Sequence, residues 1–146
     1  MPLTLRLAAA AALAVAFFAC APAFAQAPST FKVRLSPVPM DAAMRTTVAG
    51  LGNATATLQG TKLTVTGSFD GLKSPATIAQ IHTSVAPGVR GPAILDLTVS
   101  KATSGTVTGS VNLTPEQVAG LRKGQLYIQI HSEKAPDGNL WGWLLP

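Results

Sequence analysis

Apolar and polar side chains alternate along the chain in a series of short runs that begin near residue 30. In the first run, residues 30–35, Phe31 and Val33 alternate with Lys32 and Arg34. Strict alternation turns the apolar side chains to one face, which is typical of a half-buried β-strand. Five further strands are predicted at residues 78–83, 93–99, 106–113, 126–132 and 140–145.

Turn residues divide these runs. Two alternating runs, residues 54–59 and 62–69, flank the dipeptide Gly-Thr at 60–61. Glycine at the first position of a two-residue loop suits a type II′ turn, so this segment predicts a β-hairpin. Residues 36–53 keep no sustained period and predict a long loop, with a short edge strand within it as the alternative. The Pro-Asp-Gly sequence at 136–138 predicts a turn before the last strand.

One short helix is predicted among the strands. Thr114 suits the N-cap, Pro115 suits the first helical position, and Gln117 stands where a capping box needs it. Gly124 offers the end of the helix. Seven or eight short strands with a single helix predict an all-β fold, either an antiparallel β-sandwich or a closed antiparallel sheet.

A motif occurs twice, 49 residues apart. Residues 80–87 and 129–136 share Gln-Ile-His, then a hydroxyl residue, then Ala-Pro at the same offset. Two copies are too few for a solenoid. They indicate two strands in related environments, as on the two sides of a pseudo-twofold axis.

The period of two also places the polar residues of both motifs. Gln80 and His82 share one face of their strand, and Tyr127, Gln129 and His131 share one face of theirs. Ile81 lies on the opposite face of the first strand, and Ile128 and Ile130 lie on the opposite face of the second. If the isoleucine face is the core, both histidines point outward, and on neighbouring strands they could share a Zn or Cu ion, since imidazole suits both metals.

Two histidines alone are an incomplete metal site. Closed zinc sites have four ligands and catalytic zinc sites have three protein ligands. Asp96, Glu133 or Asp137 could complete such a set, although no spacing in the sequence requires it. The leading interpretation is therefore a pair of hydrogen-bonded surface histidines with no cofactor, and a metal site is the alternative.

Two tryptophans lie close to the C-terminus. Trp141 and Trp143 are two residues apart in the last predicted strand, so their side chains share a face, with Gly142 opposite. Tryptophans in this position more often cover one end of a core than bind a ligand. The alternative is a stacking surface for a sugar or an apolar partner.

The first 25 residues have the features of a cleavable secretory signal. Arg6 precedes an apolar run, and Ala23-Phe24-Ala25 provides the small-x-small pattern of a cleavage site between Ala25 and Gln26. The apolar run is too short for a transmembrane helix. A secreted or periplasmic protein of 121 residues is expected, without a membrane-spanning segment and without a cysteine; lipid anchoring through Cys20 is the alternative.

Charge and motif content exclude several functions. Without Arg6 the formal net charge falls from +5 to +4, and the basic residues are scattered singly rather than clustered, so nucleic acid is not an expected partner. No Gly-x-Ser-x-Gly elbow and no paired-carboxylate signature are present. Blue copper is excluded because it needs a cysteine thiolate.

Ordered blocks of sequence run through nearly the whole chain after the signal. They are residues 54–67 (ATATLQGTKLTVTG), 69–72 (FDGL), 74–77 (SPAT), 81–82 (IH), 86–92 (APGVRGP), 105–113 (GTVTGSVNL), 114–117 (TPEQ) and 126–131 (LYIQIH). Together they resemble the CHRD domain, the module named from chordin, over residues 31–146. The resemblance implies an immunoglobulin-like or superoxide-dismutase-like antiparallel β-sandwich without established enzymatic activity.

The chain departs from the family pattern at two places. The family often has His-x-His where this chain has Gln80-Ile81-His82, and it often has Gly-Glu-Ile-Arg-Gly where residues 138–142 read Gly-Asn-Leu-Trp-Gly. Both changes remove ionisable groups. The likeness to copper-zinc superoxide dismutase does not transfer activity either, because that chemistry needs about six histidines and this chain has two.

These observations predict a domain organisation and a function. Residues 1–25 are the signal, 26–30 a short linker and 31–146 the CHRD-like domain. We expect a monomeric binding or structural module, not an enzyme, whose partner is a protein or an envelope component. The alternatives are a Cu- or Zn-binding protein that uses His82 and His131, and a carbohydrate or envelope-polymer binder that uses Trp141 and Trp143, with Gln80, Gln129 and Tyr127 on the same face.

Overall fold

The structure is a computed structural model that describes residues 27–37 and 41–146. The expected signal, its cleavage site at Ala25 and Gln26, and Cys20 lie outside these residues. The described chain contains eight strands, one α-helix and one 3-10 helix. They are β1 (Ser29–Leu35), η1 (Met44–Thr46), β2 (Leu51–Gln59), β3 (Lys62–Asp70), β4 (Ala76–Thr83), β5 (Ala93–Val99), β6 (Gly105–Asn112), α1 (Pro115–Arg122), β7 (Leu126–Ser132) and β8 (Ala135–Trp143).

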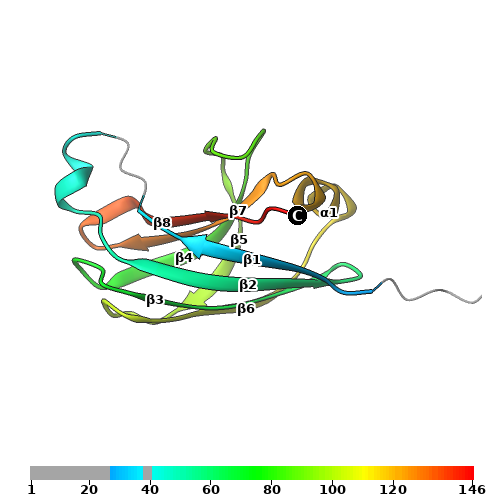
Figure 1. Ribbon diagram of the computed structural model, residues 1–146, viewed down its shortest axis with the longest axis horizontal. Coiled ribbons are helices and arrows are strands. Elements are labelled where there is room, and N and C mark those ends of the chain that lie inside the picture. The colour runs from blue at the N-terminus through cyan, green and yellow to red at the C-terminus, as the bar shows by residue number, and fades with distance from the viewer. Residues whose placement is uncertain (1–26, 38–40) are drawn as a thin grey trace, which may run out of the picture.

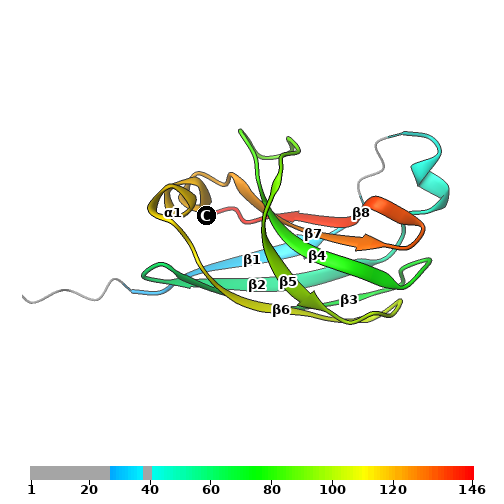
Figure 2. The same ribbon diagram turned by 180° about the vertical axis from the view of Figure 1, so that it is seen from behind.

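The eight strands form one continuous antiparallel sheet that folds into two layers. The strand order is β1-β2-β3-β6-β5-β4-β7-β8. Strand β5 joins the layers, because Leu97 pairs with β4 whereas Thr98 and Val99 pair with β6. Figures 1 and 2 show β1, β2, β3 and β6 in one layer and β4, β7 and β8 in the other. The predicted all-β antiparallel sandwich with one short helix is confirmed.

The two edge strands of the sheet approach each other and nearly close the sandwich. Ser36, just after β1, exchanges two backbone hydrogen bonds with Trp141 of β8, at 3.0 and 2.9 Å. The close approach requires a residue without a side chain at the next position of β8. A Cβ on Gly142 would lie 2.8 Å from the carbonyl oxygen of Arg34 and would also overlap Val33.

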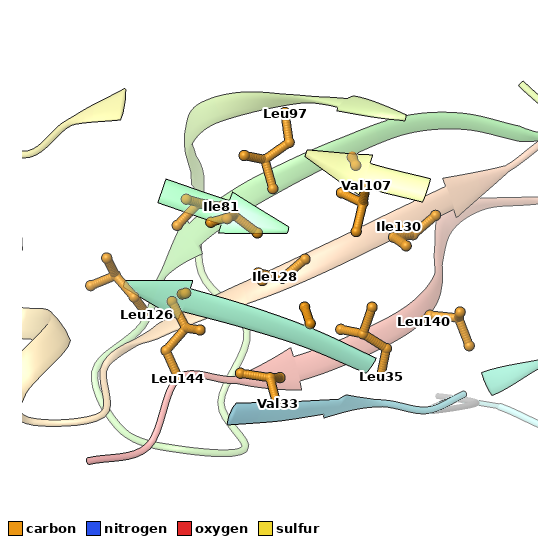
Figure 3. Close-up of a cluster of buried hydrophobic side chains, with 14 of the residues drawn as sticks. Val33, Leu35, Ile81, Leu97, Val107, Leu126, Ile128, Ile130, Leu140 and Leu144 are labelled. Atoms are coloured by element: carbon orange, nitrogen blue, oxygen red, sulfur yellow. The ribbon is translucent and has the colours of Figure 1, made fainter. Parts of the chain in front are cut away.

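The core lies between the layers and contains the isoleucine face predicted from the period of two. Ile81, Ile128 and Ile130 are fully buried, and Val33 and Val107 meet them from the other layer, as Figure 3 shows. Burying such side chains contributes about 1.5 to 3 kcal/mol each, which a chain with no disulfide among its described residues needs.

The predicted hairpin and helix are both confirmed. Gln59 pairs with Lys62 around the two-residue loop, and Gly60 has φ 62°. No residue other than glycine has a positive φ in the described segments, so the turn has the single left-handed residue of type II′. At the helix, the Thr114 hydroxyl accepts from the Gln117 amide, and the Gln117 side chain accepts from the Thr114 amide, which is the predicted capping box.

Two boundaries predicted from the sequence are wrong. The turn before the last strand is at residues 133–134, not 136–138, because Ser132 pairs with Ala135 and β8 bulges immediately afterwards. Side chains of β7 satisfy carbonyls in the bulge, which lets this Pro-Asp-Gly sequence stay within a strand. The loop predicted at 36–53 contains a 3-10 helix, and its last three residues belong to β2.

Candidate binding face

The outward side of β4, β7 and β8 carries both candidate histidines and the other residues of the ligand face predicted from the sequence. The register aligns Gln80 with Gln129 and His82 with Tyr127 across β4 and β7, and it aligns Gln129 with Trp141 across β7 and β8. We call this surface the histidine–tryptophan face; it consists of Gln80, His82, Tyr127, Gln129, His131, Trp141 and Trp143.

The repeated motif marks a local twofold relation between β4 and β7. The two strands are antiparallel neighbours, and Gln80 lies directly opposite Gln129. An axis between these glutamines relates the residues two positions further along each strand, which are His82 and His131. The duplicated sequence therefore places the two histidines in equivalent positions on one face.

The two glutamines turn away from this axis. The amide of Gln80 donates to Asp96 Oδ1 of β5 at 2.8 Å, and the amide of Gln129 donates to the carbonyl oxygen of Asp137 in β8 at 2.8 Å. Because β5 and β8 lie on opposite sides of the β4–β7 pair, the space over the pair is left to the imidazoles. The ring centroids of His82 and His131 are 6.1 Å apart.

Both imidazoles are held in the same way. His82 Nδ1 lies 2.9 Å from the carbonyl oxygen of Gly91, and His131 Nδ1 lies 2.7 Å from that of Pro136. A carbonyl oxygen only accepts, so each Nδ1 carries the hydrogen. In the neutral ring the lone pair is then on Nε2, and both Nε2 atoms are buried without a hydrogen-bond partner.

Burial lowers the pKa of His82, and the nearby charges of His131 and Arg90 lower it further. The hydrogen bond to the Gly91 carbonyl acts in the opposite direction but is a smaller effect than burial. His82 is therefore neutral near pH 7. The expectation of surface histidines is wrong for His82, which is 8% exposed, because the β4–β5 connection covers it.

Aromatic rings continue from His82 across the sheet. Tyr127 stacks on His82, with centroids 4.9 Å apart, and on Trp143, with centroids 4.7 Å apart. Trp141 lies nearly parallel to Tyr127 at 5.7 Å, and the Arg90 guanidinium lies 3.5 Å above the Trp141 ring. Trp141 is 3% exposed, so a sugar could stack on it only after Arg90 moved away.

The connection between β4 and β5 covers this face. The hydroxyl of Tyr127 accepts from the amide of Gly91 and donates to its carbonyl oxygen, both at 3.1 Å. Gly91 fits because a Cβ there would collide with the carbonyl of Thr83. Arg90 and Gly91 could not be predicted as part of this face, because no local pattern in the sequence shows that the loop folds back over the sheet.

Unpaired polar atoms are concentrated on this face. Seven buried side-chain nitrogen or oxygen atoms lack a hydrogen-bond partner among the residues that the structure describes. Six of them belong to the face or to the loop residue above it: His82 Nε2, His131 Nε2, Arg90 Nε and Nη2, Trp141 Nε1 and Trp143 Nε1. Buried polar groups are almost always paired, so this cluster has capacity for a partner outside the chain.

The sequence of the domain was compared with known families and proteins. The family model of the CHRD domain matches residues 31–144. The chain belongs to the CHRD domain family. No curated protein and no solved structure matches the chain.

The carboxylates of this CHRD domain do not complete a metal site. No group of three or more His, Cys, Asp or Glu side chains in residues 27–37 and 41–146 is placed to hold a metal ion. Asp96 instead accepts from Gln80, and Asp137 contributes its backbone carbonyl to Gln129. The histidine pair itself is the part of the predicted metal site that comes together in space.

The helices in residues 27–37 and 41–146 are short. None of them combines the length and the apolar character needed to cross a bilayer.

Proposed function

We propose that this CHRD domain is a secreted or periplasmic binding module without catalytic activity of its own, and that its ligand contacts the histidine–tryptophan face. The concentration of unpaired buried polar atoms there carries the proposal. Leaving such a group unpaired costs about 1 to 3 kcal/mol, which a bound partner would recover. The partner is a protein or an envelope component. Export of this chain is supported by its apolar N-terminal run and the Ala-x-Ala site that follows.

The absence of catalysis is tested on the exported chain, with its N-terminus established by mass spectrometry. We expect dismutase, hydrolase and oxidase rates equal to those of buffer. Robust turnover that is lost in His82→Ala would overturn the proposal. Mass spectrometry also separates cleavage after Ala25 from lipid attachment at Cys20.

Ligand contact is tested by protection of the face. Adding the cognate envelope fraction should slow hydrogen exchange of the Trp141 and Trp143 indole N–H groups. The indole signals are specific, since these are the two tryptophans of the chain. Unchanged exchange in the presence of every envelope fraction would contradict a ligand at this face.

Metal binding is a second candidate function, with Cu or Zn held by His82 and His131. One observation favours it: both rings donate through Nδ1 to backbone carbonyls, which orients imidazole ligands in metalloproteins and leaves Nε2 free to bind. Titration of the metal-free protein with Cu(II) and Zn(II) tests this candidate. Sub-micromolar metal binding that persists in His131→Ala would show that the histidine pair does not hold the metal.

A further inference from the structure

The histidine pair is suited to one particular class of ion. Resting on the proposed binding role of the histidine–tryptophan face, we propose that His82 Nε2 and His131 Nε2 together bind a single monovalent d10 metal ion, Cu(I), in two-coordinate geometry.

The separation of the rings fits one bridging ion. A metal–imidazole bond is about 2 Å long and the ring adds about 1 Å on each side, so two rings that share an ion have centroids up to about 6 to 6.5 Å apart. The observed separation is 6.1 Å. The glutamines that could have filled the space between the rings are bonded to β5 and β8 instead.

The number of ligands selects the ion. Zinc takes three or four protein ligands, and the described residues offer no third His, Cys, Asp or Glu beside the pair. Cu(I) has a filled d shell and forms stable linear complexes with two nitrogen donors. Two preoriented imidazoles are therefore sufficient for Cu(I) and insufficient for Zn(II).

The positive charge near the histidine pair also favours a monovalent ion over a divalent one. The Arg90 guanidinium lies over Trp141, 3.5 Å from the ring centroid, so it adds a positive charge to the same face. Both imidazoles donate to backbone carbonyl oxygens and not to carboxylates. A divalent ion would meet twice the repulsion from this guanidinium that a monovalent ion meets. The aromatic rings beside His82 add a polarisable surround that suits a soft monovalent ion.

The size of the ligand is also limited. His82 is 8% exposed and Tyr127 is 1% exposed, so their rings are packed within the protein. A single ion can enter between two imidazoles by small side-chain movements. A sugar or a peptide could reach the space between the imidazoles only if the β4–β5 connection opened.

The test uses the exported chain under anaerobic conditions with Cu(I) kept reduced by ascorbate, in competition with the chromophoric chelator bicinchoninate. We expect one Cu(I) per chain, at least 100-fold tighter than Zn(II), and an X-ray absorption spectrum with two nitrogen donors. His82→Gln and His131→Gln should each weaken binding by at least about 100-fold. Met44→Leu, which removes a thioether outside the face, is the matched control and should leave the affinity unchanged.

Three results would overturn the inference: no Cu(I) binding, an affinity unchanged by His131→Gln, or sulfur in the coordination sphere. If a histidine variant fails to fold, nitrogen NMR of the unaltered protein with Ag(I) decides, since both Nε2 signals must shift. If the protein binds no Cu(I) and its catalytic rates are at background, the Cu(I) inference fails while the proposed binding module stands. Turnover abolished by His82→Ala would refute the proposed function whatever the Cu(I) affinity.

Discussion

The hydroxyl of Tyr127 is the main hydrogen-bonding link between the outer face of β7 and the connection that covers it. We predict that Tyr127→Phe loosens this connection while the aromatic stack stays in place. Phenylalanine retains the ring that packs on His82 and Trp143, so the change removes only the hydroxyl. That hydroxyl makes two hydrogen bonds with Gly91.

The magnitude follows from what the lost hydroxyl leaves unpaired. The Gly91 carbonyl keeps the hydrogen bond from His82 Nδ1 at 2.9 Å, so only the Gly91 amide loses its partner. One orphaned donor costs about 1 to 3 kcal/mol, and Gly91 is half-buried, so we expect the lower part of this range, about 1 to 2 kcal/mol. Urea unfolding should show this loss with an unchanged m value.

Hydrogen exchange localises the effect. In Tyr127→Phe the Gly91 amide should exchange markedly faster. The exchange rates of core amides should rise only as far as the loss of global stability requires. Ile128→Val, at the neighbouring position of β7, is the control: it should cost about 0.5 to 1.5 kcal/mol and leave Gly91 protection unchanged relative to global stability. Full protection of Gly91 in Tyr127→Phe, or a loss of stability below 0.3 kcal/mol, would refute this reasoning.

Three further outcomes are expected. Gly142→Ala places a Cβ 2.8 Å from the carbonyl oxygen of Arg34, which cannot rotate away, so thermal unfolding should show a loss of about 1 to 3 kcal/mol. The pKa of Glu116 is lowered by hydrogen bonds from its own backbone and from the Thr114 side chain, so NMR titration should show a higher Glu116 pKa in Thr114→Ala. The stability that this carboxylate contributes is present above pH 4.5 and is lost as the pH falls through the folded pKa. Arg90→Gln should lengthen the emission wavelength of the indole beneath it and cost about 0.5 to 1 kcal/mol; unchanged emission would contradict the stacking.

Local signals in the sequence predict much of this fold. The period of two predicts which side of β4 and β7 faces the core, because alternation alone determines the face. The hairpin at Gly60 and the capping box at Thr114 are predicted for the same reason, since each depends on residues within three or four positions.

The rest depends on contacts between distant residues. The covering of the outer face requires Gly91 to meet Tyr127, which is 36 residues away. The bulge in β8 depends on side chains of β7 that bind its carbonyls, so the Pro-Asp-Gly sequence predicted a turn in the wrong place. The sequence duplication predicted that the two histidines have related surroundings, but their proximity required the strand order.

Burial on both sides of β7 explains why the histidines are held so firmly. Six of the seven residues of β7 are buried, including the outward-facing Tyr127 and Gln129. Polar side chains in such a strand need partners within the chain, and Tyr127 and Gln129 find them on the backbone of neighbouring segments. For His82 and His131 the same requirement is met through Nδ1. The hydrogen bonds that offset the burial of the imidazoles therefore also fix their tautomer, and both Nε2 lone pairs remain available to a ligand.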